Sequence, residues 1–378
     1  MKHKNFIKIA AFLCIFLFLL QTVTYIIRTN GLVKDRFTGF YGEKNNTLDV
    51  VMIGSSPVFP CFAGAKMYGS HGFTAYPLSS NMQRPMAALS LVKETEKTQH
   101  PKLYLFELKQ FTANEEDMAD NMAYTRGVTD NMKYSWNRID AINRAVPEVG
   151  ERYTYYFDIF KYHSNWKTMV LPSQIACWRY ERLEPLKGFE FKADYYPMEQ
   201  LDCSQVTDMK PIEADYEGYL RELLQYLQDH DMQALFTVAP YVYESADKQR
   251  NYNYMQRIVE SYGYQFLNLN DYTEEMGFDY ATDFYDKGVH TNAIGAEKVT
   301  DFLGAYLDQH YDLPDHRLSS TAQQSLDQRQ LEQAEKDHEN YKSWDQAYER
   351  WSQQMEESRA GLQEKIAAGA YLDQKAQD

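Results

Sequence analysis

The chain has 378 residues, of which 44% are hydrophobic, and its formal net charge at pH 7 is -15. This size and composition are sufficient for one large domain with a substantial hydrophobic core. The acidic balance argues against nucleic acid as a partner, because phosphates are neutralised by clusters of Lys and Arg that this sequence lacks.

The N-terminus contains a segment typical of a membrane anchor. Lys2, Lys4 and Lys8 precede an uncharged, mostly apolar run over residues 9–27, which as a helix nearly crosses a bilayer. No small-x-small cleavage site follows the run, and the preceding lysines favour a cytoplasmic N-terminus, although basic residues also follow the run. We therefore predict that residues 1–30 are an uncleaved, single-pass anchor in the cell membrane, with the rest of the chain extracytoplasmic.

Residues 31–48 are interpreted as a connector, and a domain is predicted over residues 49–312. Within it, continuous apolar runs typical of buried parallel strands alternate with amphipathic stretches. This alternation predicts an α/β domain whose parallel sheet has helices on both faces. We predict strands at residues 49–53, 102–108, 233–240 and 266–271, and helices at residues 63–68, 85–97, 216–230, 252–264 and 296–307.

Residues 313–378 are interpreted as a charged helical tail. They are rich in Glu, Gln, Lys and Asp, and their apolar residues form one thin stripe with spacings of three and four: Trp344, Ala347, Trp351 and Met355. Sustained heptads are absent, so a solvated helix is favoured over a coiled coil.

The first predicted strand ends at Gly54-Ser55-Ser56-Pro57, which allows two interpretations. In the first, Ser56 is the N-cap of a helix and Pro57 is its first residue. In the second, Ser56 is a nucleophile at the carboxyl end of a strand, where nearby backbone N–H groups stabilise an oxyanion. Serine needs a base for this role.

His290 is the main candidate for that base, because it lies in a polar loop before the last predicted helix. Asp286 and Asp283 precede it, and a carboxylate can orient an imidazole. The alternative is a histidine that only caps the helix. His163, in the aromatic stretch of residues 121–197, is the competing candidate. Cys61, Cys177 and Cys203 form no C-x-x-C pair and no metal-ligand spacing, so we expect no metal and no cofactor.

The motifs "DVVMIGSS" and "DFYDKGVHTNAIGA", at residues 49–56 and 283–296, resemble those of the SGNH (GDSL-type) hydrolase superfamily. The resemblance is closest to its membrane-anchored Firmicutes branch. It is more distant to the D-alanyl transfer protein of teichoic acid assembly and to alginate O-acetylation proteins. Further similar stretches are "AYPLSSNMQ", "LYLFELKQF", "FKYHSNWKTM", "LKGFEF" and "VAPYV", so the likeness covers residues 49–307.

The resemblance implies a flavodoxin-like three-layer sandwich with a mostly parallel sheet. It also implies that Ser56 is the nucleophile, His290 the general base, and Asp286 the orienting carboxylate, with Asp283 as the alternative. The family places its Asp three residues before the His, and neither aspartate has that spacing. The implied oxyanion donors are the Ser56 and Ser80 N–H groups and the Asn81 amide. This chain has no glycine in its loop of residues 78–83, where the family usually has one.

The implied function is that of an esterase or O-acyltransferase acting on acyl groups of cell-envelope polysaccharide or teichoic acid, or on a small ester. In the alternative, the chain is a non-catalytic envelope subunit that binds a polytopic membrane acyltransferase or a glycopolymer. The aromatic residues 153–166 are interpreted either as a lid that stacks on sugar rings or as ordinary packing.

Overall fold

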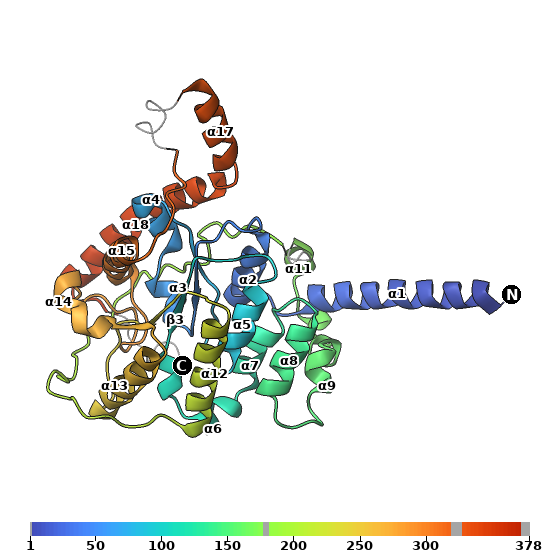
Figure 1. Ribbon diagram of the computed structural model, residues 1–378, viewed down its shortest axis with the longest axis horizontal. Coiled ribbons are helices and arrows are strands. Elements are labelled where there is room, and N and C mark those ends of the chain that lie inside the picture. The colour runs from blue at the N-terminus through green and yellow to red at the C-terminus, as the bar shows by residue number, and fades with distance from the viewer. Residues whose placement is uncertain (1, 177–180, 319–326, 372–378) are drawn as a thin grey trace.

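The computed structural model describes residues 2–176, 181–318 and 327–371 (Figure 1), so Cys177 and parts of the C-terminal segment lie outside the described residues. Five parallel strands form one sheet in the order β2-β1-β3-β4-β5. The predicted α/β class with a parallel sheet is therefore confirmed. The short strand β2 was not predicted. The strands are β1 (Val50–Ile53), β2 (Ala75–Pro77), β3 (Leu103–Glu107), β4 (Ala234–Val238) and β5 (Gln265–Asn268).

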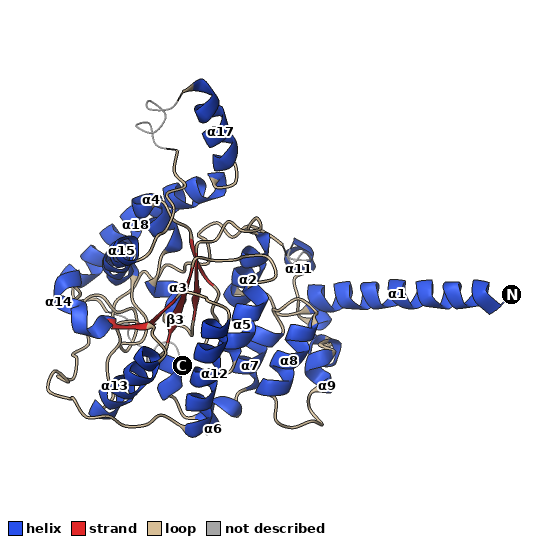
Figure 2. Ribbon diagram, viewed as in Figure 1, coloured by secondary structure: helices blue, strands red, loops and turns tan. Residues whose placement is uncertain are grey.

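The sheet lies in the interior with helices on both sides (Figure 2). Successive side chains of a strand point to opposite faces: Val51 and Ile53 join one core cluster, and Val50 and Met52 join the other. The first cluster includes residues of α2 (Leu32–Gly42), α5 (Ala87–Thr95), α12 (Ala214–Asp229) and α13 (Ala246–Ser261). The second includes residues of α3 (Val58–Cys61), α4 (Gly64–His71), α14 (Thr273–Met276) and α15 (Ala293–His310).

All five helices predicted for the domain are present, as α4, α5, α12, α13 and α15, with shifted ends. The largest difference is in α13, which begins at Ala246 rather than at Tyr252. Its first turns are polar, and only Tyr252 and later residues are buried. The apolar pattern therefore marked the buried part of the helix and missed its exposed beginning.

The expected connector at residues 31–48 is instead largely the helix α2, whose Phe37 and Phe40 lie in the core. The basic residues that made this stretch look solvated are buried as well. Arg36 donates from Nε to the Gly188 carbonyl at 3.1 Å and from Nη1 to the Ser79 carbonyl at 3.0 Å. Partners distant in the sequence thus make burial of this guanidinium possible.

The expectation of a solvated C-terminal helix is wrong for α18 (Lys342–Ala367). Its apolar stripe is buried, and the helix packs on α4 and α15 as an additional outer layer. The preceding helix, α17 (Gln328–His338), has no buried residue. The sequence showed the stripe correctly but could not show that α4 and α15 leave an apolar surface for it.

The helix α1 (Lys2–Ile27) projects from the body of the molecule (Figure 1). Its residues Lys4–Ile27 form a helix long and apolar enough to cross a membrane, by length and composition. At its base, Tyr25, Ile27 and Arg28 are buried. The aromatic stretch forms the short helices α7 (Met122–Thr129), α8 (Trp136–Ala145), α9 (Tyr153–Tyr156), α10 (Ile159–Tyr162) and α11 (Leu171–Ala176), with a 3-10 turn at Asn165–Lys167, and α10 and α11 contact α1. The helix α6 (Glu115–Ala119) precedes this stretch, and two further 3-10 turns follow β3 and β5, at Lys109–Thr112 and Leu269–Tyr272.

Candidate active site

The site lies beside β1, at the point where the order in which strands are added to the sheet changes direction. From β1 the chain continues to β2 on one side, whereas β3 pairs with β1 on the other side. Ligands of open α/β sheets bind beyond the carboxyl ends of the strands at such a point. The turn after β1 begins with Gly54, where an added Cβ would come within 2.7 Å of the Glu107 and Val58 side chains. Glycine therefore lets this turn approach the end of β3 closely.

Ser56 lies in this turn and is 7% exposed. The N-cap of α3 is Pro57, and no side chain makes a cap hydrogen bond to that helix. The interpretation of Ser56 as a helix cap is therefore wrong. Across the described residues, the Ser56 hydroxyl makes no hydrogen bond to the protein.

His290 is paired with Asp286. Its Nδ1 lies 2.5 Å from Oδ2 of Asp286, and its backbone N–H donates to Oδ1 of the same carboxylate at 2.9 Å. Burial raises the pKa of Asp286, but the hydrogen bonds and charge of His290 outweigh burial, so the pKa of Asp286 is lowered. The carboxylate is thus held ionised, as required to orient an imidazole and stabilise its protonated form.

Asp283, the alternative carboxylate, and His163, the alternative base, are not part of this histidine–carboxylate pair. Asp283 is fully buried and accepts hydrogen bonds from Nζ of Lys298 at 2.7 Å and from the Asp279 N–H at 2.8 Å. His163 is exposed, and its Nδ1 lies 3.1 Å from the Phe160 carbonyl. Neither residue is hydrogen-bonded to His290 within the described chain.

Hydrogen bonds fix the histidine loop against the helix that follows Ser56. The hydroxyl of Thr291, the neighbour of His290, donates to the Pro60 carbonyl at 3.0 Å. The Thr300 hydroxyl of α15 donates to the Cys61 carbonyl at 3.1 Å. The cap of α15 is Asn292, whose side chain accepts from two backbone N–H groups of the first turn. His290 is therefore not the cap, and its ring faces a cavity.

Ser56, His290 and Asn81 line one cavity with a volume of about 800 Å³. We call it the serine cavity. No hydrogen bond joins Ser56 to His290 among the described residues. Ser80 is buried, with its hydroxyl 3.4 Å from Oε1 of Gln83, and is not among the lining residues. Of the two oxyanion candidates in the loop after β2, Asn81 alone is exposed to the cavity.

The serine cavity has cationic residues that sequence reasoning missed. It is lined by Arg28, Lys34, Lys109, Arg126, Lys161 and Lys192, together with the acidic residues Asp130 and Glu190. Some of these charges are paired: Arg126 donates to Asp130 at 2.9 Å, and Lys192 donates to Glu190. The lining residues come from eight separate parts of the chain, so no local sequence pattern revealed them.

Glu107 is a second residue that sequence reasoning missed. It ends β3 and accepts from the Lys109 N–H at 2.9 Å and from the Ser55 hydroxyl at 3.4 Å. Burial raises the pKa of Glu107 to about 7. A carboxylate at the carboxyl end of an apolar strand was the available signal.

Comparison with protein-family models, with curated proteins and with solved structures finds no match to this chain. The assignment of chemistry to the serine cavity therefore rests on the geometry of its residues.

Proposed function

We propose that this chain is a membrane-anchored serine esterase or O-acyltransferase of the SGNH type, with the flavodoxin-like sandwich of that superfamily. One observation carries the proposal. The hydroxyl of Ser56, at the carboxyl end of β1, and the imidazole of His290, held by Asp286, line the same cavity although they are far apart in the sequence. Nucleophile, base and orienting carboxylate are the three parts that serine acyl transfer requires.

In the proposed reaction, the ionised Asp286 accepts a hydrogen bond from the Nδ1–H of His290, which leaves Nε2 free of a proton and able to accept the Ser56 proton. The serine oxygen then attacks the ester carbonyl, and the resulting oxyanion is stabilised by the Ser56 N–H and the Asn81 amide. Collapse of this intermediate breaks the ester bond, and the protonated His290 returns its proton to the leaving alcohol. The acyl group moves from Ser56 to water in an esterase, or to a hydroxyl of the acceptor in a transferase.

The absence of a hydrogen bond between Ser56 and His290 is compatible with this mechanism, because catalytic hydrogen bonds often shorten only when substrate binds. The proposed substrate is an O-acyl group on a cell-envelope polysaccharide or teichoic acid. The anchor, with its N-terminus in the cytoplasm, keeps the domain beside these polymers. Among the charged residues of the cavity wall, cations outnumber carboxylates by six to two, which favours an anionic polymer in particular.

The second candidate is a non-catalytic envelope subunit that binds a polytopic acyltransferase or a glycopolymer. Two observations favour it: Ser56 and His290 are not hydrogen-bonded to each other, and the loop of residues 78–83 has no glycine to donate a close backbone N–H. The two candidates differ in whether Ser56 is activated.

A fluorophosphonate probe tests this difference, since it reacts with activated serines. The full-length protein in detergent should be labelled, and Ser56→Ala should abolish labelling. Ser55→Ala is the matched control, because it removes the neighbouring hydroxyl, which contacts Glu107, and should leave labelling intact. Equal labelling of wild type and Ser56→Ala would instead support the binding subunit.

A further inference from the structure

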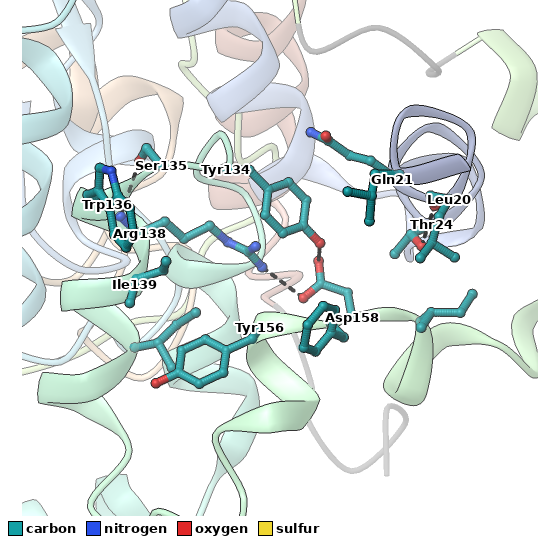
Figure 3. A pocket seen from close by; sticks show the side chains of 14 residues that line it. Leu20, Gln21, Thr24, Tyr134, Ser135, Trp136, Arg138, Ile139, Tyr156 and Asp158 are labelled. Carbon is teal, nitrogen blue, oxygen red and sulfur yellow. Dashed lines mark hydrogen bonds and ion pairs between the residues drawn. The ribbon is translucent and has the colours of Figure 1, made fainter. Parts of the chain in front are cut away.

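A second large cavity lies between the base of α1 and the helices α8–α10 (Figure 3). Its volume is about 740 Å³, and its wall is mostly apolar. Leu17, Leu20, Gln21 and Thr24 of α1 form one side, and Trp136, Ile139, Ile142, Tyr156, Phe157 and Ile159 form most of the other. We call it the α1 groove. Trp136 is 86% exposed, and Phe157 is 52% exposed.

Most polar side chains at the wall of the α1 groove, Gln21 excepted, already have hydrogen-bond partners among the described residues of the protein. Arg138 donates to Oδ1 of Asp158 at 2.7 Å, and the Tyr134 hydroxyl lies 3.4 Å from Oδ2 of the same carboxylate (Figure 3). Arg28 also donates to Oδ2 of Asp158. Because Asp158 and both arginines are buried and paired, they offer little to a polar ligand. The groove therefore fits an apolar ligand.

The position of the groove along α1 indicates which apolar ligand it meets. Leu17 precedes Arg28 by eleven residues, or about 16 Å along a helix axis. A bilayer has a hydrocarbon core of about 30 Å. If α1 crosses the membrane, the wall from Leu17 to Thr24 lies in the leaflet on the side of the domain. Trp136 and Phe157 then lie at the depth where aromatic residues are enriched in membrane proteins.

The residue types of the groove favour a lipid over a transmembrane helix of a partner. Helices that associate in membranes use Gly, Ala and Ser, which let two backbones approach closely. The wall of the α1 groove is made mostly of Leu, Ile, Tyr, Phe and Trp and has no glycine and no alanine. Its two small residues, Thr24 and Ser135, use their hydroxyls within the protein: Thr24 donates to the Leu20 carbonyl, and Ser135 accepts from Lys97. A flexible hydrocarbon chain fits between such bulky side chains, whereas a second helix is kept away by them.

We propose that the α1 groove binds one acyl chain of a phospholipid from the leaflet on the domain's side, and that α8–α10 thereby rest on the membrane. This inference depends on the membrane anchoring contained in the proposed function, but not on the chemistry of Ser56. It also defines where catalysis occurs: Arg28 and Lys34, which follow α1, line the serine cavity, so a domain seated in this way keeps that cavity close to the lipid headgroups.

The test uses the full-length protein in vesicles of phosphatidylcholine that carries a diazirine in its acyl chain. After irradiation, mass spectrometry should locate lipid adducts on Trp136, Ile139 and Phe157 as well as on α1. Ile139→Glu places a carboxylate at a 38% exposed position of the groove and should remove the adducts on Trp136 and Phe157. Leu201→Glu is the matched control, at a 44% exposed position in a loop outside the groove, and should leave them unchanged.

Adducts confined to α1, in protein that resists extraction from the vesicles by alkaline carbonate, would overturn the proposed acyl-chain site while leaving the anchor intact. Release of the protein by carbonate would overturn the anchor itself. Crosslinks from the groove to a second protein in native membranes, without lipid adducts, would assign the groove to a partner helix. Fluorophosphonate labelling of Ser56 is scored separately, so a failure of the catalytic proposal is distinguished from each of these results.

Discussion

The serine cavity and the α1 groove have similar volumes, about 800 and 740 Å³, but very different walls. The serine cavity has a hydroxyl, an imidazole–carboxylate pair and six basic residues, whereas the α1 groove is lined mainly by large apolar side chains. Volume alone therefore does not distinguish the proposed reactive site from the proposed lipid-binding one. The chemistry of the wall does, because the few polar groups placed in a pocket orient the ligand and decide what can react there.

The two cavities also share a wall. Arg28 lines the serine cavity and Asp158 lines the α1 groove, and the two side chains are hydrogen-bonded to each other. The base of α1, the groove and the serine cavity are thus one connected region, although their residues are spread over much of the chain.

The proposed catalytic residues belong to the serine cavity and not to the α1 groove. Loss of the base, in His290→Ala, therefore has the largest expected effect. Without a base for Ser56, hydrolysis of a p-nitrophenyl ester should fall to background, a loss that reaches about 10⁶-fold in fully competent serine enzymes. His163→Ala is the control, since this histidine is exposed and outside the serine cavity. Full activity in His290→Ala would contradict the role of the imidazole.

Exchange of the two aspartates for asparagine separates a catalytic from a structural carboxylate. Asp286→Asn should lower kcat by about 10⁴-fold with little change in stability, because the imidazole loses its orienting anion. Asp283→Asn should lower stability, because Asp283 is buried against Lys298, but should retain kcat per folded molecule. Steady-state kinetics and thermal unfolding of both variants check this, and the opposite pattern would assign Asp283 to the site.

The stability of the protein should depend on the carboxylate of Asp158 in the wall between the two cavities. Asp158→Asn removes the carboxylate that the buried Arg28 and Arg138 share and leaves Arg138, among the residues described, only the longer ion pair with Asp130, at 3.8 Å. We expect the free energy of unfolding to fall by about 3 kcal/mol. Asp140→Asn, at an exposed position on α8, should change it by no more than about 0.5 kcal/mol. Equal stability of both variants, measured by denaturant unfolding, would show that the wall does not depend on this ion pair.

Glu107, behind Ser55, should make stability depend on pH. Burial raises its pKa to about 7 in the folded chain, whereas an unfolded Glu titrates near about 4.3. The folded state therefore binds more protons between these values, so its contribution to stability is complete below about pH 4.3 and is lost as the pH rises through about 7. Glu107→Gln should remove up to about 4 kcal/mol of this pH dependence, whereas Glu116→Gln, at an exposed position of α6, should not. Identical pH profiles of the free energy of unfolding for wild type and Glu107→Gln would refute the assigned role of Glu107 in this pH dependence.

Much of the fold could be predicted locally, because buried strands and amphipathic helices have characteristic apolar patterns. The strands β1, β3, β4 and β5 and five helices were recognised in this way. The strand β2, with only Ala75–Pro77, is too short for a pattern. The helix α2 was missed because its basic residues are buried: Arg36 donates to the distant Gly188 carbonyl, and Lys34 donates to the Tyr25 carbonyl at the base of α1.

The candidate residues of the site follow from the sequence and the family resemblance, but their assembly does not. The sequence by itself determined an apolar N-terminal helix, an alternating α/β pattern, a serine turn after the first strand and a histidine loop with two aspartates. Only the tertiary structure decided that Asp286 rather than Asp283 holds His290, that Ser56 faces the same cavity, and that α18 packs on the domain. The physical reason is that each of these outcomes depends on contacts between segments distant in the chain, which local propensity and periodicity do not specify.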